Sequence, residues 1–409
     1  TYGGWRPASR YTYRVLIVAS VPAVYIAGIQ VEKRLTMSRD SVFESTLEFF
    51  LAPLREFLED DTVTEIMVNG YREVYVERRG KLYETDARFE SEDALVSAIT
   101  NIAQYVGREI DRDRPILDAR LPSGSRVHAV IPPSSRTGTY LTIRKFKRDI
   151  FSLEDFVRLG SISVEAKEFL EFCVRLKKNI VVAGGTGTGK TTMLNAVSTA
   201  VSENERIVVI EDSSELKLGQ KHALYLEAQQ ADSYGRGSVT IRDLFRASLR
   251  MRPDRIIVGE VRGGEALDMV QSMISGHTGS LTTVHATSPR DALVRLETLS
   301  LMSDVDIPVY VARAQVASAI NVIVQLSRFA DDGSRKVTRV AEAFGLGANN
   351  EYQFHDIFKS QMRGRSEAGE LISELEFTGQ QPTFASEPYE HGLEADINHT
   401  LPLWEKSDT

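Results

Sequence analysis

The segment from residue 184 to 191 has the composition and spacing of a phosphate-binding loop. It consists of Gly184, Gly185, Thr186, Gly187, Thr188, Gly189, Lys190 and Thr191. Such glycines let backbone N–H groups turn inward around phosphate oxygens, and the start of the following helix adds a partial positive charge. Lys190 would neutralise the β and γ phosphates, and the Thr191 hydroxyl would ligate Mg²⁺. We therefore predict that this loop, together with Thr192, binds ATP and Mg²⁺.

Acidic residues follow the next two apolar runs of the chain. Glu211 and Asp212 come after residues 206–210, and Glu260 ends a second run. In a parallel sheet these carboxylates would lie beside the phosphate loop. Gly259 stands where an Asp commonly precedes the Glu, so we expect Glu211 and Asp212 to share metal ligation, and Glu260 to act as the base or to orient water. The alternative is that each is a strand-end cap or a surface carboxylate.

Two histidines, His277 and His285, flank the strand-like run 281–284. Their spacing is unlike that of a zinc pair, and no cysteine is near. Beside a phosphate loop, we predict that one of them senses the γ-phosphate. The alternative is that both are core histidines with satisfied hydrogen bonds.

Arginines complete the candidate set, because positive charge stabilises phosphoryl transfer. The sequence does not rank them, and each could instead be a surface charge. The pool is Arg120, Arg126, Arg144, Arg242, Arg246, Arg250 and Arg262, of which Arg262 is counted with the catalytic candidates.

Short apolar runs alternate with helical patterns in the second half of the chain, as a parallel sheet requires. Strands are predicted over 179–183, 206–210, 255–258 and 280–284, and helices over 190–201, 241–250, 265–275 and 289–302. The residues that could do chemistry thus sit at strand ends of an α/β domain.

The first half has the pattern of a smaller α+β domain. Two strand-like runs, 63–70 and 73–82, are separated at Asn69-Gly70, which is typical of a hairpin turn. A helix with one apolar face is predicted around 95–106 and another over 42–59, and further strands over 127–131 and 140–144. We predict four parts: an extension over 1–36, an α+β domain over 37–148, an ATPase domain over 149–345 and a C-terminal extension over 346–409.

Length and composition limit the remaining possibilities. A chain of 409 residues favours two or three domains. The net charge of −8 provides no global field for nucleic acid, so no direct nucleic-acid partner is expected. The single cysteine, Cys173, excludes an intramolecular disulfide and fits a reducing compartment.

Residues 1–36 resemble no part of an α/β domain. Apolar residues 15–29 follow three arginines, but Pro22 interrupts them, and the run is shorter than a membrane span requires. Three interpretations stay open: a non-native or disordered extension, a membrane-surface anchor, or a signal.

Together the motifs resemble the type II/type IV secretion ATPase superfamily. The boxes are the phosphate loop, 210–212, 251–262 and 276–286, and Gly259 is usual there. Within it, 63–70, 118–127 and 142–146 resemble the Tad/Flp pilus assembly ATPases of the CpaF type.

The resemblance implies a RecA-like P-loop ATPase domain, with a mostly parallel sheet and flanking helices, preceded by the smaller α+β domain. It further implies a homohexamer in the cytoplasm, peripheral at the inner membrane, that contacts a membrane platform protein and pilin machinery. It assigns a Walker B role to Glu260 and a histidine-box role to His277 and His285, and brings Arg120, Arg126 and Arg144 to the nucleotide.

Three functions remain in competition. The first is an ATP-driven motor for pilus assembly or type II secretion. The second is an ATPase for conjugation or type IV secretion of DNA. The third is a nucleotide-gated docking module with negligible turnover.

Overall fold

The computed structural model describes residues 46–47, 49–78, 80–145, 151–229, 231, 235–329, 332–366 and 371–404. The proposed extension 1–36 and the predicted boundary at 148 lie outside these residues. No helix in the described ranges is both long and apolar enough to cross a membrane.

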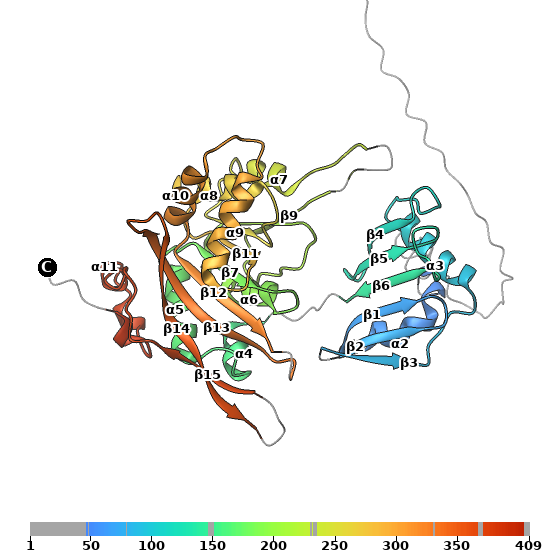
Figure 1. Cartoon of the computed structure of the whole chain (residues 1–409), viewed down its shortest axis with the longest axis horizontal. Coiled ribbons are helices and arrows are strands. Elements are labelled where there is room, and N and C mark those ends of the chain that lie inside the picture. Colours follow the sequence, from blue (N-terminus) through green and yellow to red (C-terminus); the bar gives the residue numbers. More distant parts are fainter. Residues whose placement is uncertain are drawn as a thin grey trace, which may run out of the picture. The chain divides into compact units, whose positions relative to one another are not determined.

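The first half of the chain forms a six-stranded antiparallel sheet in the order β3-β2-β1-β6-β5-β4 (Figure 1). The predicted turn is confirmed: the Asn69 N–H donates to the Glu73 carbonyl, and Gly70 has a φ of 73°. The strands are β1 (Val63–Asn69), β2 (Val74–Arg78), β3 (Lys81–Thr85), β4 (Ile116–Arg120), β5 (Arg126–Val130) and β6 (Tyr140–Arg144).

Helices pack on this sheet. The predicted amphipathic helix is confirmed as α3 (Glu92–Tyr105), whose apolar residues are buried and whose N-terminus is capped by Ser91. The long helix predicted over 42–59 is instead interrupted: residues 46, 47, 49 and 50 are helical, Leu51 is in a turn, and η1 (Ala52–Leu54) and α2 (Arg55–Glu59) follow. Pro53 is the physical reason, because it has no N–H to donate to the preceding turn.

The second half forms a nine-stranded sheet in the order β15-β14-β13-β12-β7-β11-β10-β8-β9. Pairs from β12 through β7 to β9 are parallel, and β12 to β15 pair antiparallel. The strands are β7 (Ile180–Gly184), β8 (Ile207–Glu211), β9 (Ala223–Glu227), β10 (Arg255–Val258), β11 (Leu281–His285), β12 (Val322–Arg328), β13 (Arg335–Leu346), β14 (Tyr352–Arg365) and β15 (Leu371–Phe377).

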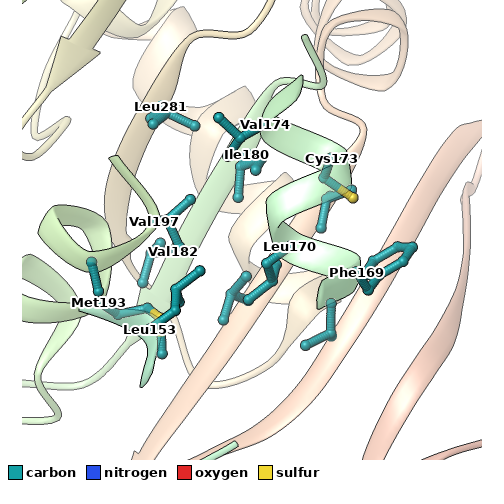
Figure 2. Close-up of a cluster of buried hydrophobic side chains, with 14 of the residues drawn as sticks. Leu153, Phe169, Leu170, Cys173, Val174, Ile180, Val182, Met193, Val197 and Leu281 are labelled. Carbon is teal, nitrogen blue, oxygen red and sulfur yellow. The ribbon is translucent and has the colours of Figure 1, made fainter. Parts of the chain in front are cut away.

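Helices cover both faces of this sheet, because successive residues of a buried strand point to opposite sides. Ile180 and Val182 of β7 face one apolar cluster, with α5 and Cys173, as Figure 2 shows. Val181 and Ala183 face a second cluster with α8, α9 and α10. The helices are α4 (Leu153–Arg158), α5 (Val164–Arg175), α6 (Lys190–Ser198), α7 (Ile241–Ser248), α8 (Glu265–Ile274), α9 (Pro289–Leu301), α10 (Val309–Ala319) and α11 (Glu387–Glu390).

Residues after 345 are not a separate extension, contrary to the prediction. Strands β14 and β15 continue the main sheet. Trp404 is 4% exposed and stacks on Phe169 of α5, with ring centroids 5.7 Å apart. The buried carboxylate of Glu168 accepts hydrogen bonds from the backbone N–H groups of residues 398, 399 and 400. These contacts make the segment part of the domain core.

Asn179 joins three neighbouring strands at their amino ends. Its side-chain nitrogen donates to the Ala319 carbonyl before β12, and its side-chain oxygen accepts the Ser280 N–H before β11. Its own N–H donates to the side chain of Asn321. The amino ends of β7, β11 and β12 are therefore held in one register.

Candidate nucleotide-binding site

The phosphate loop connects β7 to α6, and its glycines are required by its shape. Gly187 and Gly189 have φ angles of 69° and 93°, in the left-handed region that favours glycine. A methyl group at Gly184 would lie 2.5 Å from Oγ1 of Thr188. That hydroxyl donates to the Gly185 carbonyl at 3.0 Å. Thr186 lies in the loop, and Thr191 and Thr192 lie in the first turn of α6.

Lys190 provides a buried positive charge at this loop. It is 8% exposed, and its ammonium donates to the Gly185 carbonyl at 3.0 Å. Burial lowers the pKa of Lys190, because the charged form loses its hydration. A desolvated cation beside inward-turned glycines at the start of a helix fits the phosphate chain of a nucleotide.

Glu260 lies two residues after the end of β10, next to Arg262 and His285. One of its oxygens, Oε2, accepts from Arg262 Nη2 at 2.6 Å, and the other, Oε1, lies 2.8 Å from Nε2 of His285. Among the described residues, no group donates a well-aligned hydrogen bond to the buried Oε1. In this conformation Oε1 faces His285 Nε2, and a carboxylate at this position could accept a proton.

His285 links Glu260 to the loop. It is the last residue of β11 and pairs with Gly184 of β7, so the sheet itself places it beside the loop. Its Nε2 lies 3.4 Å from the Lys190 ammonium. Burial, and then the charge of Lys190, lower the pKa of His285, while Glu260 opposes this shift. The neutral imidazole is therefore favoured at neutral pH.

Glu211 ends β8, as predicted, but the following turn engages its side chain. Its side chain is 4% exposed, and Oε1 accepts the backbone N–H groups of Glu215 and Leu216 at 2.8 and 3.0 Å. Through Oε1 it holds the turn after β8, and its role as a metal ligand stays a prediction. A methyl group at Gly259 would lie 2.9 Å from Glu211 Cγ, which explains why glycine precedes Glu260 here.

Asp212 and Thr191 also carry oxygens that could hold Mg²⁺. Asp212 is half exposed, and its Oδ2 lies 3.6 Å from Arg262 Nη1. Mg²⁺ in nucleotide sites commonly takes one or two protein oxygens together with phosphate and water. The described residues contain no cluster of three His, Cys, Asp or Glu side chains suited to a metal.

We expect Glu211 to make stability pH-dependent. Burial raises its pKa from 4.5 to about 7, although the N–H groups of Glu215 and Leu216 act in the opposite direction. Because the folded state holds this proton more tightly, the associated stability is complete below about pH 4.5 and is lost as the pH rises towards 7.

In Glu211→Gln the amide oxygen can accept the same two N–H groups without ionising. The variant should therefore show a flatter pH profile of unfolding midpoint between pH 5 and 8, and should gain up to about 3 kcal/mol over wild type at pH 8. Thermal unfolding at several pH values measures this, with exposed Glu203→Gln as control. An equal slope in wild type and Glu211→Gln would contradict the assignment.

His277 does not join the site. It precedes β11, whereas His285 ends that strand, so the two histidines lie at opposite edges of the sheet. The His277 N–H donates to Ser272, and its carbonyl accepts from Ser280. Of the two histidines, only His285 lies beside the phosphate loop, where the predicted sensor would have to be.

Apart from Arg262, the arginines of the predicted pool divide into two groups. Arg120 donates to Ser213 Oγ at 2.6 Å, and Arg126 forms an ion pair with Glu215 at 3.0 Å, so both contact the loop after β8. Arg144 ends β6, and its charge acts on Lys190. Arg242 and Arg246 instead pair with Asp268 of α8, away from the loop, and Arg250 follows α7 on that side.

Two arginines that the sequence analysis did not single out lie against the phosphate loop. A methyl group at Gly187 would lie 3.5 Å from Arg328 Nη1, and one at Gly189 would lie 4.0 Å from Arg335 Cδ. One feature of the sequence could have pointed to them. The mostly apolar run 322–326 predicts a strand that ends shortly before Arg328.

The comparisons with known proteins agree with this geometry. The family model described as "Type II/IV secretion system protein" matches residues 50–380. The chain belongs to this family. As a type II/IV secretion family member, it is 36% identical over 321 residues to the type IV secretion system protein PtlH of Bordetella pertussis, covering 72% of this chain and 94% of PtlH.

Another relative is the type IV secretion system protein VirB11 of Brucella suis. It is 32% identical over 317 residues, covering 71% of this chain and 88% of VirB11. Among solved structures, the pilus retraction motor PilT with bound ADP is 18% identical with a TM-score of 0.50, covering 86% of this chain and 87% of PilT. The likeness is to the fold. The predicted α/β class, with a RecA-like P-loop domain, is confirmed.

Proposed function

We propose that this secretion-family protein is an ATP-hydrolysing motor, acting as a homohexamer, that powers assembly of Tad/Flp-type pili or related type II secretion. The observation that carries the proposal is the meeting of Lys190, Glu260 and His285 at the carboxyl edge of one sheet. Such an arrangement supplies a phosphate cradle, a carboxylate for water and a group that senses phosphate.

Each residue has a definite task in this proposal. Lys190 binds the β and γ phosphates of ATP, while Thr191 and Asp212 hold Mg²⁺, which neutralises phosphate charge when bound. Glu260 orients a water molecule and accepts its proton. Arg262 holds the other oxygen of Glu260 in place.

The mechanical output and partners follow from the family resemblance. Loss of the γ-phosphate would release the contacts that hold neighbouring parts of the protein closed. We place the hexamer in the cytoplasm at the inner-membrane face, on a platform protein of the pilus or secretion machinery. No direct nucleic-acid partner is proposed, because the net charge is −8.

A second candidate is a motor of type IV secretion. PtlH and VirB11 are both type IV secretion system proteins, and this chain covers most of each. Their names favour this machinery over the Tad/Flp one. Deletion of the gene in its host separates the two, since loss of surface pili favours the first candidate and loss of secreted cargo with pili retained favours the second.

The shared core of both candidates is tested with purified protein. We expect MgATP to yield steady phosphate release and to favour hexamers in native mass spectrometry. Monomers alone with MgATP would contradict the hexamer. Binding of MgATP without measurable turnover in the assembled hexamer would instead favour a nucleotide-gated docking module.

A further inference from the structure

The paired ends of β12 and β13 bring two positive charges to the phosphate loop. Strand β12 pairs with β7 up to the level of Leu326 and Gly184, the first glycine of the loop. A methyl group at Gly189 would lie 3.9 Å from Leu326 Cδ2. Arg328 is two residues further along β12, and therefore on the same face as Leu326.

Arg335 lies directly opposite Arg328. The two are register partners on β12 and β13, which run side by side in Figure 1. Their side chains approach neighbouring glycines of the loop, Gly187 and Gly189. Like charges directly opposite one another on neighbouring strands are destabilising. The facing of two arginines across these strands therefore costs stability in the unliganded protein.

Few negative charges offset these arginines. Among the described residues, neither Arg328 nor Arg335 forms an ion pair, and Arg328 donates only to the Gly80 carbonyl. Although much of Arg335 is exposed, partial desolvation and then the charge of Arg328 lower its pKa; Glu77 opposes this shift, and Arg144 adds to it. Arg144 also acts on Lys190, so four cations act around one loop.

We propose that Arg328 and Arg335 are binding residues for the phosphate chain of the nucleotide, reaching the loop from the side opposite Glu260 in the strand order. This inference rests on the proposed nucleotide-binding function. The pairing of β12 with β13 does not itself require arginine at either position. Phosphate binding is thus an additional function of this strand pair in the proposal. Guanidinium groups suit it, because their planar N–H donors match phosphate oxygens.

The test measures binding of MgATP and MgADP by fluorescence titration with mant-labelled nucleotides. Arg335→Gln should raise the Kd for both nucleotides about tenfold or more, because a charge-assisted hydrogen bond is lost. Its Kd should also depend less on salt than that of wild type. Arg328→Gln should behave alike, and Arg335→Lys should recover part of the affinity.

Lys336→Gln is the matched control. It removes the same charge from the next residue of β13, whose side chain points to the other face of the sheet. We expect its Kd to equal that of wild type.

Thermal unfolding without nucleotide separates binding from a structural role. Arg335→Gln should unfold at the wild-type temperature or above, because a repulsive pair is removed. A lower midpoint without nucleotide, with no recovery in Arg335→Lys, would show that Arg335 merely supports the loop.

The controls keep this inference separate from the proposed function. If wild type binds MgATP and Arg335→Gln binds it equally well, the inference fails and the proposed function stands. If wild type itself does not bind MgATP, the proposed function fails.

Discussion

Lys190→Ala is expected to reduce ATP turnover by about 100-fold or more, because it removes the ammonium that neutralises the phosphates. The fold should survive. Burial disfavours the charged form of Lys190, so removing the side chain should cost little stability. The Gly185 carbonyl, which accepts its hydrogen bond, then lies next to the open loop. Phosphate release and thermal unfolding, measured on the same preparation, check both halves of this expectation.

Lys221→Ala serves as the control for Lys190→Ala, since Lys221 is exposed before β9. It should retain wild-type turnover. Normal hydrolysis by Lys190→Ala would overturn the assignment of the phosphate site, whereas a large fall in its unfolding midpoint would show that the lysine is needed for folding.

Glu260→Gln is expected to lower kcat by about 10²- to 10⁴-fold, the usual range for loss of a general base. The amide keeps the size of the side chain but cannot take a proton from water. Binding of MgATP should change little, because Lys190 and the loop glycines remain. Single-turnover phosphate release and nucleotide titration measure the two properties separately.

Exposed Glu203→Gln is the matched control for charge. Arg262→Gln is informative as well, because Arg262 holds one oxygen of Glu260 and should affect kcat more than Kd. If Glu260→Gln hydrolysed ATP at the wild-type rate, another residue would have to activate the water.

Much of the fold could be predicted from local patterns. The apolar runs of β7, β8, β10 and β11 are short and buried on both faces, which distinguishes them from helices. Strand β14 lacked such a signal, because most of its residues are partly or fully exposed and its sequence does not alternate. Its place in the sheet depends on pairing with β13 and β15.

From the sequence, the candidate site could be predicted only for residues at the carboxyl ends of the parallel strands. Glu260 and His285 follow from lying at the carboxyl ends of parallel strands, although their roles stay predictions. His277 was misplaced, because a residue before a parallel strand lies at the opposite edge. Glu211 also lies at the carboxyl end of a parallel strand, as predicted. One of its carboxylate oxygens, however, accepts hydrogen bonds from the N–H groups of the following turn.

The arginines at the loop depend on longer-range structure. Arg328 and Arg335 come together through the pairing of β12 with β13, a contact that no spacing in the sequence specifies. Both arginines lie more than a hundred residues after the glycine-rich segment, so the local motif does not indicate them.

The hydrogen bonds of Asn179 bear on how such a protein could move. Since one amide fastens β7, β11 and β12 together at the edge remote from the phosphate loop, these strands cannot slide past each other without breaking buried bonds. The middle of the sheet is then a fixed frame. Shape changes during a catalytic cycle must come from side chains and loops at its open edge, or from rigid-body displacement of whole units.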